Sequence, residues 1–140
     1  MEEPLEILVV EPDSRNRQAA RDGCPDGVVL IFAGSYEEAM IEVEKNNSYD
    51  KGIFELRIPR DGKINGWGYL PMLAAMNRRM PSLLFTEKPA WGEARAYIDP
   101  LFYIASPDRC QLKTAKKSEK DSWSQVFDYL INNKEVTEML

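Results

Sequence analysis

The sequence predicts an α/β domain in which a five-stranded, doubly wound parallel sheet carries helices on both faces. Two observations support this prediction. Short apolar runs alternate five times with segments of helical spacing, and the runs are apolar almost throughout rather than alternating with polar residues. Continuous apolar runs are typical of parallel strands buried on both faces, and helical crossovers connect such strands within one sheet. We therefore expect a single domain over residues 1–140.

Each predicted strand is a short apolar run that ends at a residue unsuited to continue it. In chain order the five strands are expected at Leu5–Val10, Val28–Ala33, Lys51–Pro59, Pro81–Thr86 and Leu101–Ser106. Pro59 and Pro107 are expected to end the third and fifth strands, because proline cannot donate a hydrogen bond to a sheet ladder.

Local capping signals place the helices between these strands. Ser35 and Glu38 have the spacing of a capping box, and Ser14 is a candidate cap for the first helix. The expected helices are Ser14–Gly23, the segment after Ser35, Leu70–Arg79 with Pro71 in its first turn, Ala90–Ile98, and a last helix opened by Ser118.

Composition excludes several classes of function. The net charge of −5 disfavours unspecific binding to nucleic acid or to an anionic membrane surface, and no apolar run approaches the ~20 residues of a membrane span. Cys24 and Cys110 stand alone, which favours reduced thiols in a cytoplasmic protein. The chain has no histidine, so Ser/His/Asp catalysis, Cys/His catalysis and the common zinc sites are excluded.

The candidate site residues directly follow the predicted strands. Ligands of open α/β sheets bind beyond the carboxyl ends of the strands. Those positions hold Glu11 and Asp13, Glu55, Thr86 and Ser106.

In this order the motifs resemble the receiver domain of bacterial response regulators, over residues 5–134. "LVVEP" stands where that family holds Mg²⁺ with two acids, and "ELRIP" resembles the phosphoacceptor motif with Glu55 in place of Asp. "SLLFT" ends in Thr86 as the switch threonine does, and "YIASP" has Tyr103 at the switch aromatic and Ser106 where the family has lysine. The resemblance implies the flavodoxin-like strand order 2-1-3-4-5.

The departures from the family pattern imply a degenerate receiver, a pseudo-receiver. Glu55 replaces the nucleophilic Asp, Pro12 replaces the second acid and Ser106 replaces the lysine. Glutamate adds about 1.5 Å of reach, and a misplacement of about 1 Å can slow a reaction about 10²-fold. The missing acid and lysine remove charge neutralisation that phosphoryl transfer needs. We therefore expect a phosphorylation-independent signalling and protein-interaction module, not an enzyme and without a required cofactor, with Glu55 as a fixed negative charge.

Two other functions stay open. The first is an atypical phosphoacceptor regulator that uses Glu55 or Asp13, with Mg²⁺ held by Glu11 and Glu55. The second is a flavodoxin-like binder of a small ligand, which is disfavoured because no phosphate-cradling glycine loop follows the first strand.

Several single residues also have two interpretations. Glu11 and Glu55 form either a remnant acidic pocket that faces Thr86 or a pair of solvated strand-end acids. Asp13 fits a helix N-terminal acid better than a metal ligand. Lys88 is either a solvated loop residue or a replacement for the missing lysine.

Other residues are candidates for contacts with partners. Arg57 is expected at the surface or paired with one of the strand-end acids. The run "KTAKK", residues 113–117, is expected as a solvated basic loop or a docking site. Trp91, Tyr97 and Tyr103 form the predicted interaction face, because aromatic residues are enriched at interfaces. A kinase, a regulator or an output domain is the expected partner, and a homodimer stays an alternative.

Overall fold

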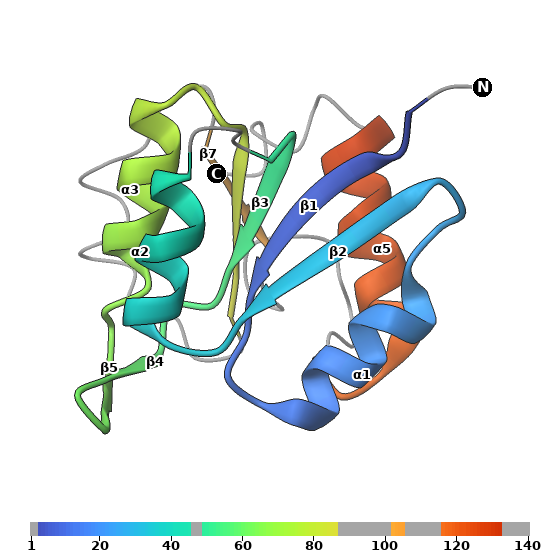
Figure 1. Cartoon of the computed structure of the whole chain (residues 1–140). Helices are drawn as coiled ribbons and strands as arrows, with labels where there is room; N and C mark the ends of the chain where they lie inside the picture. Colours follow the sequence, from blue (N-terminus) through green and yellow to red (C-terminus); the bar gives the residue numbers. More distant parts are fainter. Residues whose placement is uncertain (1–2, 46–48, 87–101, 106–115, 133–140) are drawn as a thin grey trace.

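The main sheet has five parallel strands in the order β2-β1-β3-β6-β7 (Figure 1). The computed structural model of the chain describes residues 3–45, 49–86, 102–105 and 116–132. The strands of the main sheet are β1 (Leu5–Val10), β2 (Val28–Ala33), β3 (Lys51–Phe54), β6 (Ser82–Phe85) and β7 (Phe102–Ala105). β4 and β5 lie outside this sheet, so its five strands, numbered in chain order, have the order 2-1-3-4-5. This confirms the predicted fold.

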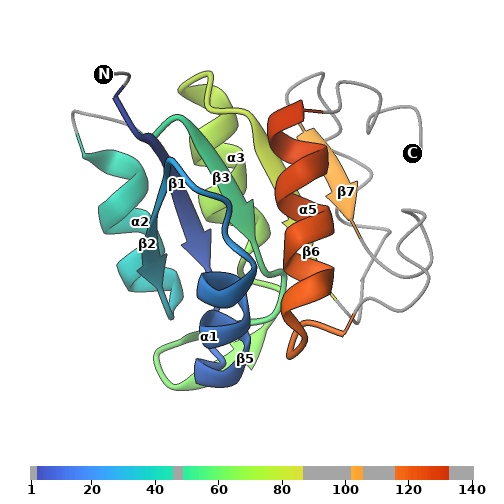
Figure 2. The ribbon, with the colours of Figure 1, turned by 90° about the vertical axis from the view of Figure 1, so that its right-hand side faces the viewer.

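Helices cover both faces of the sheet. α1 (Ser14–Gly23) and α5 (Lys120–Asn132) lie on one face, and α2 (Tyr36–Glu44) and α3 (Tyr69–Asn77) lie on the other (Figure 2). The predicted helix Ala90–Ile98 lies outside the described residues. No helix in the described part of the chain is long and apolar enough to cross a membrane.

The interior strand β1 contributes side chains to both layers of the core. Ile7 and Val9 belong to the apolar cluster on the α1/α5 face, and Leu8 and Val10 belong to the cluster on the α2/α3 face. All four side chains are buried. A parallel strand in the middle of a doubly wound sheet is buried on both faces, which explains why "ILVV" is apolar without interruption.

The third strand is shorter than the sequence predicted. β3 ends at Phe54, and the apolar residues Leu56 and Ile58 beyond it are buried against the α2/α3 cluster rather than paired in the sheet. Burial under a helix and burial in a sheet look alike in sequence, so the apolar residues of "KGIFELRIP" predict one strand, which the structure ends at Phe54.

The predicted glycine-bearing loop contains a small hairpin. β4 (Ile58–Arg60) pairs antiparallel with β5 (Lys63–Asn65). The turn between them places Asp61 at φ 52° and Gly62 at φ 77°. Positive φ at both central residues is typical of a type I′ hairpin turn, for which Asp-Gly is a favoured pair. Pro59 therefore lies inside β4 and does not end a central strand.

Helix caps follow the predictions in part. Ser35 caps α2 and accepts a hydrogen bond from the Glu38 backbone N–H at 3.1 Å, as predicted. The cap of α1 is Asp13, not Ser14, which is the first helical residue. α5 begins at Lys120, two residues after the predicted opening at Ser118.

Candidate functional site

Parallel pairing brings three of the predicted residues to the same edge of the sheet. The Glu11 backbone N–H donates to the Ala33 carbonyl, and that of Glu55 donates to the Val10 carbonyl, each at 2.9 Å, so both acids extend the ladder by one step. Thr86 directly follows β6, and both Thr86 and Glu11 are buried. The carboxyl ends of β1, β3 and β6 therefore enclose Glu11, Glu55 and Thr86.

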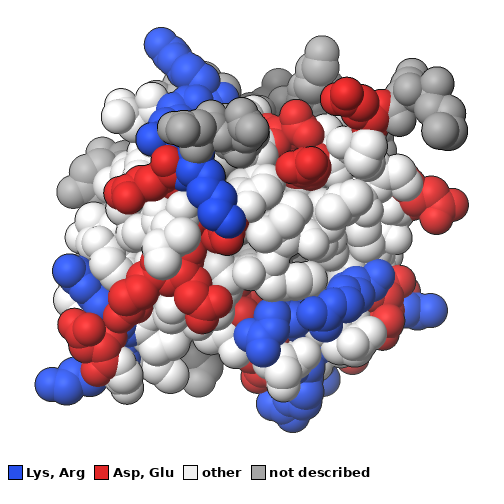
Figure 3. Space-filling model, in the orientation of Figure 1, with Lys and Arg blue, Asp and Glu red and all other residues white. Residues whose placement is uncertain are grey.

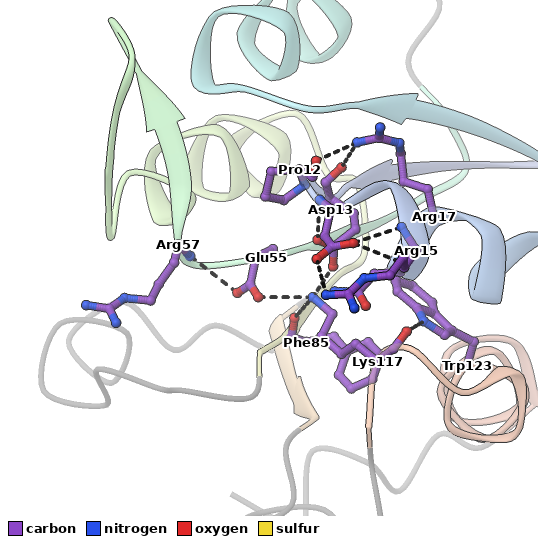
Figure 4. A network of polar contacts seen from close by, with 11 residues as sticks. Pro12, Asp13, Arg15, Arg17, Glu55, Arg57, Phe85, Lys117 and Trp123 are labelled. Carbon is purple, nitrogen blue, oxygen red and sulfur yellow. Dashed lines mark hydrogen bonds and ion pairs between the residues drawn. The ribbon is translucent and has the colours of Figure 1, made fainter.

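A lysine lies between the two glutamates, and Figure 4 shows it beside Glu55. The Lys117 ammonium forms an ion pair with Oε1 of Glu11 and one of 3.1 Å with Oε1 of Glu55. It also donates to the Phe85 backbone carbonyl at 2.9 Å. Lys117 is only 1% exposed. A buried lysine is stable only when its charge is paired and its donors are satisfied, and this one meets both conditions.

Aromatic rings and the start of α5 hold Lys117 in place. Its Nζ lies 5.0 Å from the centre of the Phe85 ring and 5.6 Å from that of Trp123, within the range of cation–π attraction. The Trp123 indole N–H donates to the Lys117 backbone carbonyl at 2.6 Å. Because Trp123 belongs to α5, the acidic site and this helix are joined through one residue.

The ion pairs shift the pKa of Lys117. Burial alone lowers the pKa of this ammonium, but the carboxylates of Glu55 and Glu11 outweigh burial, so the net pKa is raised above its ordinary value. A raised pKa in the folded state means that this contribution to stability is complete at neutral pH. It is lost only in the alkaline range, as the pH rises through the folded-state value.

The second oxygen of each glutamate is bound by backbone. Oε2 of Glu11 accepts from the Asp13 N–H at 3.1 Å, and Oε2 of Glu55 accepts from the Arg57 N–H at 3.3 Å. The Arg57 side chain points away from the site and is exposed (Figure 4). Its guanidinium therefore belongs to the surface, and only its backbone contributes to the site.

Asp13 serves the helix that follows it. Its carboxylate accepts hydrogen bonds from the backbone N–H groups of Arg15 at 2.8 Å and Asn16 at 3.4 Å. The bond from Arg15 is the largest cause of a lowered pKa for Asp13. Arg17, one turn into α1, donates to the carbonyls of Glu11 and Pro12, both at 2.8 Å, and so fixes the strand-to-helix turn. Asp13 therefore stands beside the acidic pocket while its carboxylate caps α1.

The arrangement does not fit a bound Mg²⁺. The described residues contain no group of three or more His, Cys, Asp or Glu side chains that could hold a metal. Oε1 of Glu11 and Oε1 of Glu55 both contact Lys117, whose ammonium fills the space between them. A divalent ion would have to displace Lys117 and would still find few protein oxygens.

Lys117 is the residue that sequence analysis missed. The interpretation of "KTAKK" as a solvated loop or docking site is wrong for Lys117, although Lys116 is exposed. The assumption that Ser106 leaves the pocket without a lysine is also wrong, because Lys117 supplies the cation from the segment before α5. One signal was available: two acids predicted at one buried sheet edge require a cation, and Lys117 shortly precedes the apolar stripe of the last helix.

The remaining predicted residues are only partly described. Tyr103 lies on β7 opposite Leu83, but its side chain is not among those described. Lys88, Trp91, Tyr97 and Ser106 lie outside the described residues.

Comparison with known proteins identifies the fold. No protein-family model and no curated protein matches this sequence. The structure is similar to a response regulator receiver domain protein (CheY-like) from Methanospirillum hungatei, with a TM-score of 0.64 and 16% identity over 94% of this chain and 98% of the other. It is similar to the N-terminal domain of a response regulator/sensory box/GGDEF 3-domain protein from Carboxydothermus hydrogenoformans, with a TM-score of 0.65 and 17% identity over 92% of each chain. A response regulator receiver protein from Sinorhizobium medicae matches with a TM-score of 0.64 and 13% identity over 96% of this chain and 98% of the other.

Proposed function

We propose that this domain, which has the receiver fold, is a phosphorylation-independent protein-interaction module of a signalling system. In this proposal Lys117, rather than a metal ion, is the counter-ion of the acidic pocket, and no transferred phosphate is required. The domain would then present one surface to its partner without a covalent modification. A kinase, a regulator or an output domain is the class of partner that the fold suggests, and one structural neighbour is itself the first domain of a three-domain response regulator.

The buried Glu11–Lys117–Glu55 network is the observation that carries the proposal. Phosphoryl transfer needs an exposed carboxylate oxygen that can attack phosphorus in line. Of the two Glu55 carboxylate oxygens, Oε1 is paired with Lys117 and Oε2 accepts the Arg57 N–H, and its side chain is 12% exposed. Pro12, between Glu11 and Asp13, offers no carboxylate for a metal. The pocket is therefore saturated by groups of the chain itself.

The network also supplies a route to a partner surface. Lys117 binds Trp123 of α5 through its carbonyl, and Ser124 of α5 donates to the Gly23 carbonyl of α1 at 3.1 Å. The position of α5 is thereby tied to the state of the pocket. With Lys117 held by two carboxylates, we propose that α5 keeps one position and that the domain acts as a constant docking unit. This differs from a bare phosphate mimic, since the charge of Glu55 is paired.

Phosphodonor treatment tests the proposal directly. The purified chain is incubated with acetyl phosphate and Mg²⁺, and its intact mass is measured over time. We expect no species heavier by about 80 Da, the mass of one phosphoryl group carried covalently. A conventional receiver domain treated in parallel shows that the donor is active. Appearance of the heavier species on the wild-type chain would refute the proposal.

One observation favours a second candidate, the atypical phosphoacceptor. Lys117 restores a cation next to Glu55, which is one of the parts that phosphoryl transfer requires. Its ammonium would then neutralise charge on the transferred group while an oxygen of Glu55 forms the bond to phosphorus and the donor's leaving group departs. The same mass measurement separates the two functions.

A gain-of-function variant sharpens the test. The double variant Pro12→Asp/Glu55→Asp restores the second acid and shortens the acceptor by one methylene. If the two substitutions account for the loss, this variant should gain the heavier species while each single variant gains little, because a metal site and a correctly placed nucleophile are both needed. If the double variant does not gain the heavier species, then Lys117 or the surrounding packing, rather than these two positions, prevents phosphorylation.

A further inference from the structure

The outer strand β2 has an edge that no described strand pairs with. β2 is the first strand in the sheet order, and its only described neighbour is β1. Its sequence, "VVLIFA", contains neither a charged residue nor a proline. Natural proteins protect exposed edges with charged residues or proline, because free backbone N–H and C=O groups next to apolar side chains can pair with another chain. β2 lacks that protection, and Val29 within it is 45% exposed.

A groove runs beside this edge on the α1 face. One cavity of about 440 Å³ lies toward the start of β2 and is lined by Val28, Leu30 and Phe32 of the strand and by Arg21 of α1, among others. A second cavity of about 260 Å³ lies toward the end of β2, and Phe32 lines it as well. Together they follow the strand along its length. An edge strand beside a helix-walled groove is the geometry with which proteins bind extended peptides by strand addition.

The charges around the edge differ between the two faces (Figure 3). Basic side chains gather over α1, and acidic side chains gather over α2, with an apolar band between them. On the α1 side the Arg21 guanidinium stacks over the Phe32 ring at 4.6 Å, and Arg17 lines the second cavity. On the α2 side Glu37 and Glu38 are exposed. Each cavity also has one acidic residue in its lining, Asp26 in the first and Glu38 in the second. Arg17 already donates to two backbone carbonyls, so the exposed Arg21 is the cation that the groove offers to a negatively charged group of a ligand.

We propose that the outer edge of β2 binds an extended segment of another protein by strand addition. Because side chains alternate along a strand, every second residue of the segment faces the α1 groove. One of these residues is acidic in the proposal and meets Arg21, and an apolar one packs on Leu30 and Phe32. The residues in between face the α2 side, where Val29 offers an apolar contact. This site is separate from the acidic pocket and does not depend on it.

A second copy of the chain fits this edge less well. Two β2 strands that pair antiparallel in one continuous sheet are related by a two-fold axis perpendicular to the sheet, which keeps each face on its own side. The basic α1 helices would then lie next to each other, and so would the acidic α2 helices. Juxtaposed like charges at an interface are unfavourable. The charges therefore select a partner that differs from the chain itself.

Fluorescence anisotropy with a labelled peptide tests the proposal. The probe is acetyl-TEVLVTT-amide, in which Glu and Leu occupy alternate positions. We expect the wild-type chain to bind it, and Arg21→Glu to weaken binding by at least about tenfold, because an attraction becomes a repulsion. The matched control is Lys63→Glu on β5, which changes the net charge equally at an exposed site of the hairpin and should bind as the wild type does. Circular dichroism melting curves check that both variants are folded.

Two further experiments test whether backbone hydrogen bonds hold the peptide and whether a second copy of the chain binds the edge instead. A version of the peptide with alternate N-methylated amides cannot form the ladder and should not bind. The proposal is overturned if that version binds equally well, if Arg21→Glu has no effect, or if the unmodified peptide does not bind. Analytical ultracentrifugation of the wild type and of Val29→Lys tests whether a second copy of the chain binds the edge. If the wild type forms a dimer that Val29→Lys abolishes, the edge belongs to a second copy and the proposal is overturned.

Discussion

The carboxyl end of the sheet and the edge of β2 satisfy their polar groups in opposite ways. At the carboxyl end, Glu11 and Glu55 meet the buried ammonium of Lys117, and their remaining oxygens accept backbone N–H groups. Along the outer edge of β2, no described strand pairs with the backbone. The first region is complete within the chain, whereas the second leaves hydrogen-bonding groups for another chain.

This difference separates a sheet edge whose charged groups are bound within the chain from an edge whose backbone groups are open to another chain. At the strand ends, one lysine is shared by two glutamates of the same chain. Surface available for binding by strand addition lies instead at β2. A substitution should therefore have a large effect on stability at the closed pocket and a small one at the open edge.

The largest expected effect follows from removal of Lys117. Lys117→Met should lower the free energy of unfolding by about 3–5 kcal/mol, because it leaves two glutamates in a buried pocket without a counter-ion. The matched control is Lys116→Met at the exposed neighbouring position, which should change it by no more than about 0.5 kcal/mol. Urea unfolding at neutral pH measures both.

A triple variant then distinguishes lost charge pairing from lost packing. Glu11→Gln/Glu55→Gln/Lys117→Met removes all three charges and should recover much of the stability that Lys117→Met loses, since no charge is left buried alone. If Lys117→Met and Lys116→Met are equally stable, the pocket is not closed by Lys117, and the contrast between the two regions fails.

The same substitution at two sheet positions gives the next effect. Val9→Thr places a hydroxyl in the core, where Val9 is 0% exposed, and should cost about 1–3 kcal/mol. Val29→Thr places it on the β2 edge, where Val29 is 45% exposed, and should cost no more than about 0.5 kcal/mol. Thermal and urea unfolding compare the pair. A large cost at Val29 would show that something in the folded chain already covers the edge.

The smallest expected effect concerns the boundary of the pocket. Asp13→Ala should cost about 1 kcal/mol, the usual loss of a helix N-cap. Since the pKa of Asp13 is lowered in the folded state, chiefly by the Arg15 N–H, this contribution is present at neutral pH and is lost as the pH falls into the acid range. Asp22→Ala on the exposed face of α1 is the control and should be nearly neutral. A much larger cost for Asp13→Ala in urea unfolding would show that its carboxylate supports the pocket and not only α1.

Local patterns in the sequence determined most of the fold. The apolar runs predicted all five strands of the sheet, and Ser35 with Glu38 predicted the start of α2. These features depend on residues close together in the chain, because strand burial and helix capping are decided within a few positions. The positions of Glu11, Glu55 and Thr86 at one edge followed as well, since parallel strands end on the same side.

Only the tertiary structure decided which group closes the pocket. Lys117 is 62 residues from Glu55 in the chain, and its place shortly before the apolar stripe of the last helix does not by itself show that its side chain enters the pocket. Leu56 and Ile58 likewise show that an apolar residue beyond the end of a strand can be buried under a helix instead of in the main sheet. Burial of a charge depends on which distant side chains surround it, and the cost of leaving a charge unpaired is what brings Lys117 between Glu11 and Glu55.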